Sequence, residues 1–159
     1  MSSEGLAPSP TSQASIPALI RQASRCLDRV PYWLLAIPLR LAVATVFWNS
    51  AIAHLANWQT TLYLFANDYR LPFLPSVPAA YMAVSIEVST PILLVLGFLT
   101  RPAALVLLGM VTVIEVFVYP QAWPTHIQWV AMLLVLLCRG AGTLSIDHLL
   151  ARYFFQPRK

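Results

Sequence analysis

Three charged side chains lie inside long, mainly apolar segments of this sequence: Arg40, Glu87 and Glu115. A carboxyl group held away from bulk water can pass protons, and a guanidinium can donate hydrogen bonds to a carbonyl oxygen. If these segments cross a membrane, inserting each charged side chain costs roughly 2.5 to 3.5 kcal/mol. We therefore expect each of them to face the interior of the protein and to have a structural or functional role there. We therefore take Glu87 as the candidate proton-transfer group.

Two histidines extend this set. His54 lies on the same helical face as Arg40, near the other end of its segment, and His126 opens the last apolar segment from that same side. Two imidazoles at one mouth, with both carboxyl groups below them, would enclose a polar pocket. The candidate ligand-binding residues are thus Arg40, His54, Glu87, Glu115 and His126.

The same residues also have a plain structural interpretation, which the sequence leaves open. Polar side chains inside membranes often only hold helices together, and a histidine at a membrane boundary is common. Neither the histidines nor Cys26 and Cys138 show metal-ligand or C-x-x-C spacing. We therefore expect no metal site, no covalently bound cofactor and no disulfide.

The elements that must position these residues are apolar helices. The chain has 159 residues, of which 58% are hydrophobic and only 10% charged, unlike a soluble domain. A membrane-spanning helix needs about 20 mostly apolar residues, and four segments reach or approach that length. The spans are expected at about 32–55, 79–99, 102–119 and 125–138. The predicted fold is an all-α integral membrane four-helix bundle over residues 31–142.

Positive charges set the expected orientation, because cytoplasmic loops are enriched in Lys and Arg. Most of them precede the first span, follow the last one or lie between the second and third: Arg21, Arg25, Arg29, Arg101, Arg139, Arg152, Arg158 and Lys159. Both termini are therefore predicted to be cytoplasmic. Cleavage of a signal peptide after residues 51–53 is a minor alternative, against which Arg40 argues. The charge of +4 reflects this topology, so no nucleic-acid partner is expected.

The flanking segments are expected to be simple. Residues 1–18 predict a disordered tail, 19–30 a basic amphipathic helix, and 143–159 a second surface helix and tail, with Ser145 as N-cap and Asp147 in its first turn. Between the second and third spans, Gly97 marks a helix end and Thr100 is the predicted next N-cap. The aromatic loop 56–78 is either a lid or an interfacial anchor.

Four motifs occur in order along the chain: "LRLAVATVFWNS", "SIEVSTPILLVLGFLTRPAAL", "WPTHIQW" and "RGAGTLSIDHLL". With them the chain resembles, over about residues 33–150, the DoxX family of four-helix bacterial membrane proteins. That family takes its name from a subunit of a thiosulfate:quinone oxidoreductase, and other members are implicated in redox-stress or sulfur-linked complexes. The resemblance implies a multi-pass protein of the bacterial inner membrane with redox character. "FWNS", "DYRLPFLP" and "FVYPQAWPTH" look similar to members linked to metal stress, which implies an accessory role in copper or oxidant defence.

We therefore expect a membrane subunit of a redox complex whose pocket accommodates a quinone or similar small ligand. Arg40 and His126 would donate hydrogen bonds to carbonyl oxygens, and Glu87 would pass protons. A protein partner would supply electrons, so the chain is not expected to be a complete enzyme alone. The alternative is a noncatalytic membrane scaffold or a small-solute or metal-stress accessory protein.

Overall fold

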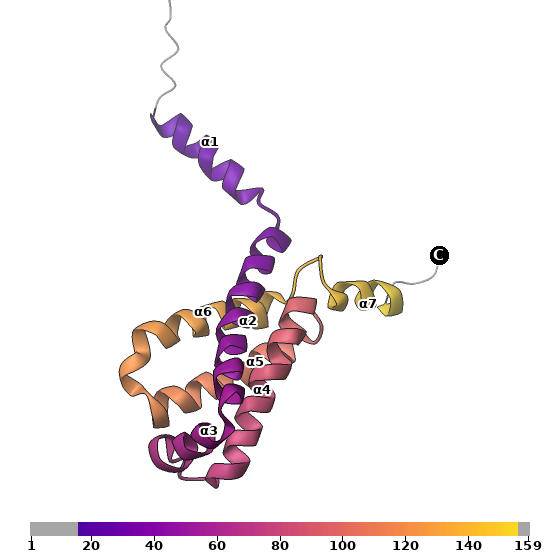
Figure 1. The fold of residues 1–159 in the computed structure, drawn as a ribbon. Coiled ribbons are helices and arrows are strands. Elements are labelled where there is room, and N and C mark those ends of the chain that lie inside the picture. The colour runs from indigo at the N-terminus through magenta and orange to yellow at the C-terminus, as the bar shows by residue number, and fades with distance from the viewer. Residues whose placement is uncertain (1–15, 156–159) are drawn as a thin grey trace, which may run out of the picture. The chain divides into compact units, whose positions relative to one another are not determined.

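The structure is a computed structural model that describes residues 16–155; most of the predicted tail, residues 1–15, lies outside the described residues. Every regular element in this range is helical, and no strand occurs within it (Figure 1). Four helical segments are long and apolar enough to cross a membrane: Tyr32–Ala56, Ser76–Leu96, Thr100–Val118 and Pro120–Arg139. The predicted all-α membrane bundle is confirmed.

The amphipathic helix α1 (Ile16–Asp28) belongs to a separate unit, Met1–Pro31. It begins at Ile16 rather than at the predicted Leu19. Its apolar stripe is uncovered within that unit, with Leu27 71% exposed. A helix with one apolar and one basic face is suited to an anionic membrane surface.

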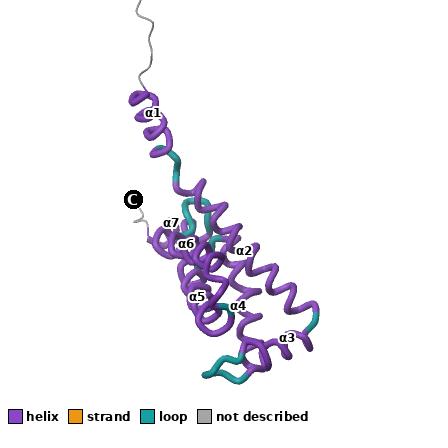
Figure 2. Tube along the Cα trace, turned by 90° about the vertical axis from the view of Figure 1, so that its left-hand side faces the viewer, coloured by secondary structure: helices purple, strands orange, loops and turns teal. Residues whose placement is uncertain are grey.

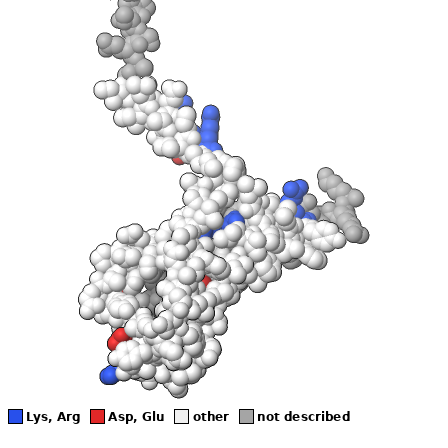
Figure 3. Space-filling view, viewed as in Figure 1, with Lys and Arg blue, Asp and Glu red and all other residues white. Residues whose placement is uncertain are grey.

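The second unit contains the bundle of long helices. They are α2 (Tyr32–Ala56), α4 (Ser76–Leu96), α5 (Thr100–Val113) with its π-helical continuation η2 (Ile114–Val118), and α6 (Trp123–Arg139). Between α2 and α4 lie α3 (Trp58–Leu64) and the π-helix η1 (Phe65–Tyr69), and the 3-10 turn η3 (Pro120–Ala122) precedes α6. Helix α7 (Ile146–Phe155) follows. On the face that Figure 3 shows, the sides of the long helices carry few charged atoms, as a lipid-facing surface requires.

The two ends of the bundle are built from different elements. We call the end formed by α3, η1, η2 and η3 the loop end, and the end formed by the start of α2, the α4–α5 turn and the α6–α7 connection the arginine end (Figures 1 and 2). Between them, large apolar side chains such as Phe47, Leu107 and Leu133 form the core. Buried alanines, including Ala44 and Ala104, let the helices approach closely.

Arg40 organises the arginine end. Its guanidinium is buried and donates to four backbone carbonyls: Nε to Leu94 O (2.7 Å), Nη2 to Val95 O (2.6 Å), and Nη1 to Ala141 O (3.0 Å) and Leu144 O (2.9 Å). The last carbonyls of a helix lack partners within the helix, and buried ones must find them elsewhere. Arg40 thus ties the end of α4 to the α6–α7 connection.

Asp147 caps a helix to which it does not belong. Its carboxylate accepts hydrogen bonds from the backbone N–H groups of Leu99 (2.8 Å) and Thr100 (3.0 Å), at the start of α5. The prediction that Thr100 is the N-cap of this helix is wrong, because Leu99 occupies that position and Thr100 is already helical. Ser145 as N-cap is confirmed, since its Oγ accepts a hydrogen bond from His148 N.

Gly97 gives a first prediction. Its φ is +65°, and a Cβ there would lie 2.6 Å from the Cβ of Ser145 and 3.0 Å from Nη1 of Arg40. Left-handed backbone costs an ordinary residue roughly 1 to 2 kcal/mol and overpacking a further 1 to 3. We expect Gly97→Ala to lower the free energy of unfolding by about 2–4 kcal/mol, measured by circular dichroism during SDS titration in mixed micelles.

The matched control is Gly109→Ala, because Gly109 lies within α5 and a Cβ there has no neighbour within 4 Å. Alanine favours a helix over glycine by about 1 kcal/mol, so this variant should be as stable as the wild type or more so. Equal stability of the two alanine variants would contradict the account of the α4–α5 turn.

Candidate functional site

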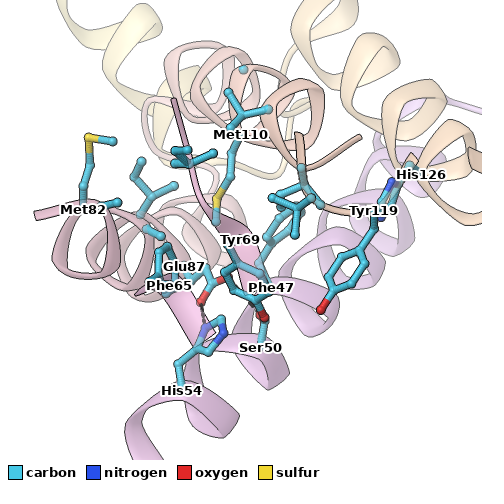
Figure 4. Close-up of a pocket in the computed structure, with 18 of the residues that line it drawn as sticks. Phe47, Ser50, His54, Phe65, Tyr69, Met82, Glu87, Met110, Tyr119 and His126 are labelled. Carbon is cyan, nitrogen blue, oxygen red and sulfur yellow. Dashed lines mark hydrogen bonds and ion pairs between the residues drawn. The ribbon is translucent and has the colours of Figure 1, made fainter. Parts of the chain in front are cut away.

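A pocket of about 420 Å³ lies at the loop end of the bundle, within the range of small-molecule sites (Figure 4). Its wall is built by α2, η1, α4, α5, η2 and α6, which bring together residues far apart in the sequence. Most of the lining is apolar or aromatic: Val46, Phe47, Phe65, Leu71, Phe73, Ala83, Ile86, Met110, Val113 and Trp129. A few polar groups converge on it, and they determine what it could bind.

The first polar cluster joins α2 to α4. Glu87 uses both carboxylate oxygens: Oε1 accepts from Ser50 Oγ (2.9 Å), and Oε2 is hydrogen bonded to His54 Nδ1 (2.8 Å). Ser50 and His54 lie one helical turn apart, so both face the same point on α4. The Glu87 side chain is 4% exposed and that of His54 is 15% exposed. Glu87 is therefore not an isolated charge but half of a His–Glu pair.

The second cluster joins α6 to η2. His126 Nδ1 is hydrogen bonded to Glu115 Oε2 at 2.5 Å, and the imidazole packs against Trp129. Glu115 lies in the π-helical segment, where the N–H of Tyr119 bonds back to Ile114 O. Single π-helical turns inside longer helices are frequent at functional sites, because they change the face on which side chains emerge. His126 lines the pocket, and Glu115 holds it in place.

The two pairs have the same chemical design. In each, a carboxylate holds Nδ1 of the ring, which orients the imidazole and leaves Nε2 for a ligand. A pair that carries two protons presents Nε2–H as a donor, whereas a pair with one proton presents Nε2 as an acceptor. Each pair can therefore bind a ligand oxygen and exchange one proton with it.

Aromatic side chains cover the pocket at the loop end. Edge-to-face or tilted contacts join Phe65 to His54 and Tyr69, Tyr69 to Tyr119, and Phe73 to Phe117. Burial raises the pKa of the Tyr69 phenol, and the neighbouring Tyr119 raises it further. Tyr69 therefore stays protonated at neutral pH and can donate a hydrogen bond. The segment predicted as a lid or an anchor forms α3 and η1 and contributes Phe65, Tyr69, Leu71 and Phe73 to the lining.

Of the five predicted ligand-binding residues, three line the pocket: His54, Glu87 and His126. Glu115 reaches it through His126. Arg40 is not among the lining residues, because its guanidinium is occupied by four carbonyls at the arginine end. Within residues 16–155, no group of three or more His, Cys, Asp and Glu side chains could hold a metal ion.

Three polar pocket residues were not predicted: Ser50, Tyr69 and Tyr119. Ser50 lies one turn before His54 on the same face, so helical spacing could have identified it. Tyr69 had no such signal, because its position depends on how η1 folds back over the bundle.

Comparison with known proteins gives a family match. The model of the family described as DoxX matches residues 35–120, more than half of the chain. The matched range contains Arg40, His54, Glu87 and Glu115, whereas His126 follows it. Neither a curated protein nor a solved structure matches the chain.

Proposed function

This chain belongs to the DoxX family, and from that premise we propose that it is a membrane subunit of a redox complex whose loop-end pocket binds a quinone or a similar small ligand. The observation that carries the proposal is the presence of two His–Glu pairs beside one apolar pocket, His54–Glu87 and His126–Glu115. The apolar and aromatic lining suits a flat ring, and the pairs suit its oxygens.

The number of His–Glu pairs equals the number of protons that a quinone takes up when it is reduced. A quinone takes up two electrons and two protons to become a quinol, and one proton is added to each carbonyl oxygen. In this proposal, His54 and His126 each donate Nε2–H to one oxygen and transfer that proton as the electrons arrive. The carboxyl groups of Glu87 and Glu115 hold Nδ1 of their histidines before and after the proton transfer. A partner protein supplies the electrons.

The proposal also assigns an orientation. Arg101 and Arg139 lie at the arginine end, where α2 begins and α6 ends. Because Lys and Arg favour the cytoplasmic side, this end lies in the cytoplasm, and the loop end faces the opposite side of a bacterial inner membrane. Protons for quinol formation would then enter from the loop end.

The test is native mass spectrometry of the protein extracted gently from its own membrane. The wild type should carry the mass of a quinone. Ala83→Phe should reduce that occupancy at least about tenfold, because Ala83 lines the pocket and a phenyl ring there fills it. Ala42→Phe is the matched control, since Ala42 is an exposed alanine of α2 outside the pocket lining.

A wild-type mass that contains only phospholipid or a protein partner would contradict the quinone pocket. It would favour the noncatalytic scaffold, in which the His–Glu pairs only hold α2 to α4 and α6 to η2. Equal loss of quinone in both phenylalanine variants would place the ligand outside the pocket.

A further inference from the structure

Helices α4 and α5 pack on each other beside their turn and then enclose the pocket farther along. Next to the turn, Leu94 of α4 is fully buried in one cluster with Ala104 and Leu107 of α5. Toward the loop end, Ile86 of α4 and Met110 of α5 both line the pocket. The pocket therefore extends between the two helices.

Two lining residues on these helices are also exposed at the surface. Met82 is 51% exposed, and Gly109 is exposed with open space where a side chain would stand. Because Gly109 has no side chain and no atom lies within 4 Å of where a Cβ would stand, the pocket is open to the surface at this point. Figure 4 shows Met82 at one side of the pocket and His126 at the other, with Glu87 and Tyr69 between them.

The depth of Gly109 places this opening in lipid. It lies about 14 Å from the start of α5 at 1.5 Å per residue, which is near the middle of a hydrocarbon layer roughly 30 Å thick. At the loop end the lining residues Phe73 (59% exposed) and Tyr119 (47% exposed) also reach the surface, but their rings pack against those of Phe117 and Tyr69 and cover the pocket there. A solute from water would have to displace this aromatic cover, whereas a lipid-dissolved ligand would not.

We infer that the ligand enters sideways from the bilayer between Met82 and Gly109, and that it is an amphiphile whose hydrocarbon chain remains in this opening while its polar ring reaches the His–Glu pairs. This inference rests on the proposed function and narrows the ligand class to quinones with a long apolar chain. The ligand's hydrocarbon chain then occupies the space that a side chain at position 109 would fill.

The test is a set of variants at the opening, in phosphatidylcholine nanodiscs. The probes are an isoprenoid ubiquinone and its ring-only analogue, and binding is followed by quenching of tryptophan fluorescence, since Trp129 lines the pocket. Gly109→Phe should slow association of the isoprenoid quinone by a factor at least about tenfold greater than the factor by which it slows the ring-only analogue. Phenylalanine adds no competing fluorophore.

Two controls separate the opening from the helix. Gly109→Ala keeps the opening wide, and Leu105→Phe adds the same ring one turn earlier on α5, where Leu105 is 60% exposed and outside the lining. Both should bind the isoprenoid quinone at the wild-type rate. If Gly109→Phe also weakens binding of the ring-only analogue, Met82→Phe serves as the second test. It narrows the same opening from α4, and it must slow association of the isoprenoid quinone more than that of the ring-only analogue.

An unchanged association rate in Gly109→Phe and Met82→Phe would overturn the lateral entrance while leaving the quinone pocket standing. Failure of the wild type to bind either probe would instead overturn the proposed function itself.

Discussion

Replacement of Arg40 by methionine should lower the free energy of unfolding by about 3–5 kcal/mol. The side chain is 6% exposed and donates to carbonyls of Leu94, Val95, Ala141 and Leu144. Each buried polar group left without a partner costs about 1–3 kcal/mol, and partial relaxation reduces the sum. Methionine fills a similar volume, so the loss reports the hydrogen bonds rather than a cavity. SDS titration in mixed micelles, followed by circular dichroism, measures it.

Two variants sharpen this prediction. Arg40→Lys keeps the charge but replaces a planar fork by a single nitrogen, so it should recover less than half of the loss. Arg101→Met is the matched control, because Arg101 is exposed and makes one long hydrogen bond, 3.3 Å, to Cys138 O; it should change stability by less than about 1 kcal/mol. If Arg40→Met were as stable as Arg101→Met, the assignment of Arg40 to the arginine end would fail.

The same variant tests whether Arg40 contributes to ligand binding. Folded Arg40→Met should bind the ring-only quinone with the wild-type Kd, since the pocket lining does not include Arg40. A selective loss of affinity without loss of stability would restore the sequence-based prediction that its guanidinium contacts the ligand.

The second large effect concerns the His54–Glu87 pair. Glu87→Leu leaves Ser50 Oγ and His54 Nδ1 without their partner at a largely buried position, so we expect a loss of about 2–4 kcal/mol in stability. It also removes the group that orients His54. The Kd for the quinone should therefore rise at least about tenfold, which corresponds to 1.4 kcal/mol.

The double variant Glu87→Leu with His54→Phe separates structure from function. Replacing both partners by apolar groups can be nearly neutral for stability, and a phenyl ring can keep the edge contact with Phe65. Ser50 Oγ still lacks the partner that it had in Glu87, so we expect the double variant to recover about half of the stability lost in Glu87→Leu, with the affinity still lost. A double variant that is stable and binds normally would show that the pair only holds α2 against α4.

Membrane segments are the part of this protein that the sequence predicts most directly. Hydrocarbon tolerates only long apolar helices whose backbone groups are satisfied internally, so the four predicted spans lie close to α2, α4, α5–η2 and η3–α6. Local signals also sufficed for the end of α4 at Gly97 and for the N-cap of α7 at Ser145. Each depends on a few consecutive residues.

The candidate site was only partly predictable. Helical phase placed Arg40 and His54 on one face of α2, and the positions of His126 and both glutamates suggested a pocket at the loop end. Helical phase did not show that the Arg40 guanidinium donates its hydrogen bonds to backbone carbonyls. Nor did it show that each glutamate pairs with one particular histidine. Phase gives the face on which a side chain lies, whereas the partner depends on the crossing of two helices.

The sequence by itself therefore determined that the chain is an all-α membrane bundle and that it buries Arg40 and Glu87. Tertiary structure alone decided what those residues contact. Asp147 caps α5 rather than its own helix because α7 starts against the α4–α5 turn, and Glu115 meets His126 where η2 is π-helical. Such contacts join residues distant in sequence, and their geometry arises only when the helices pack.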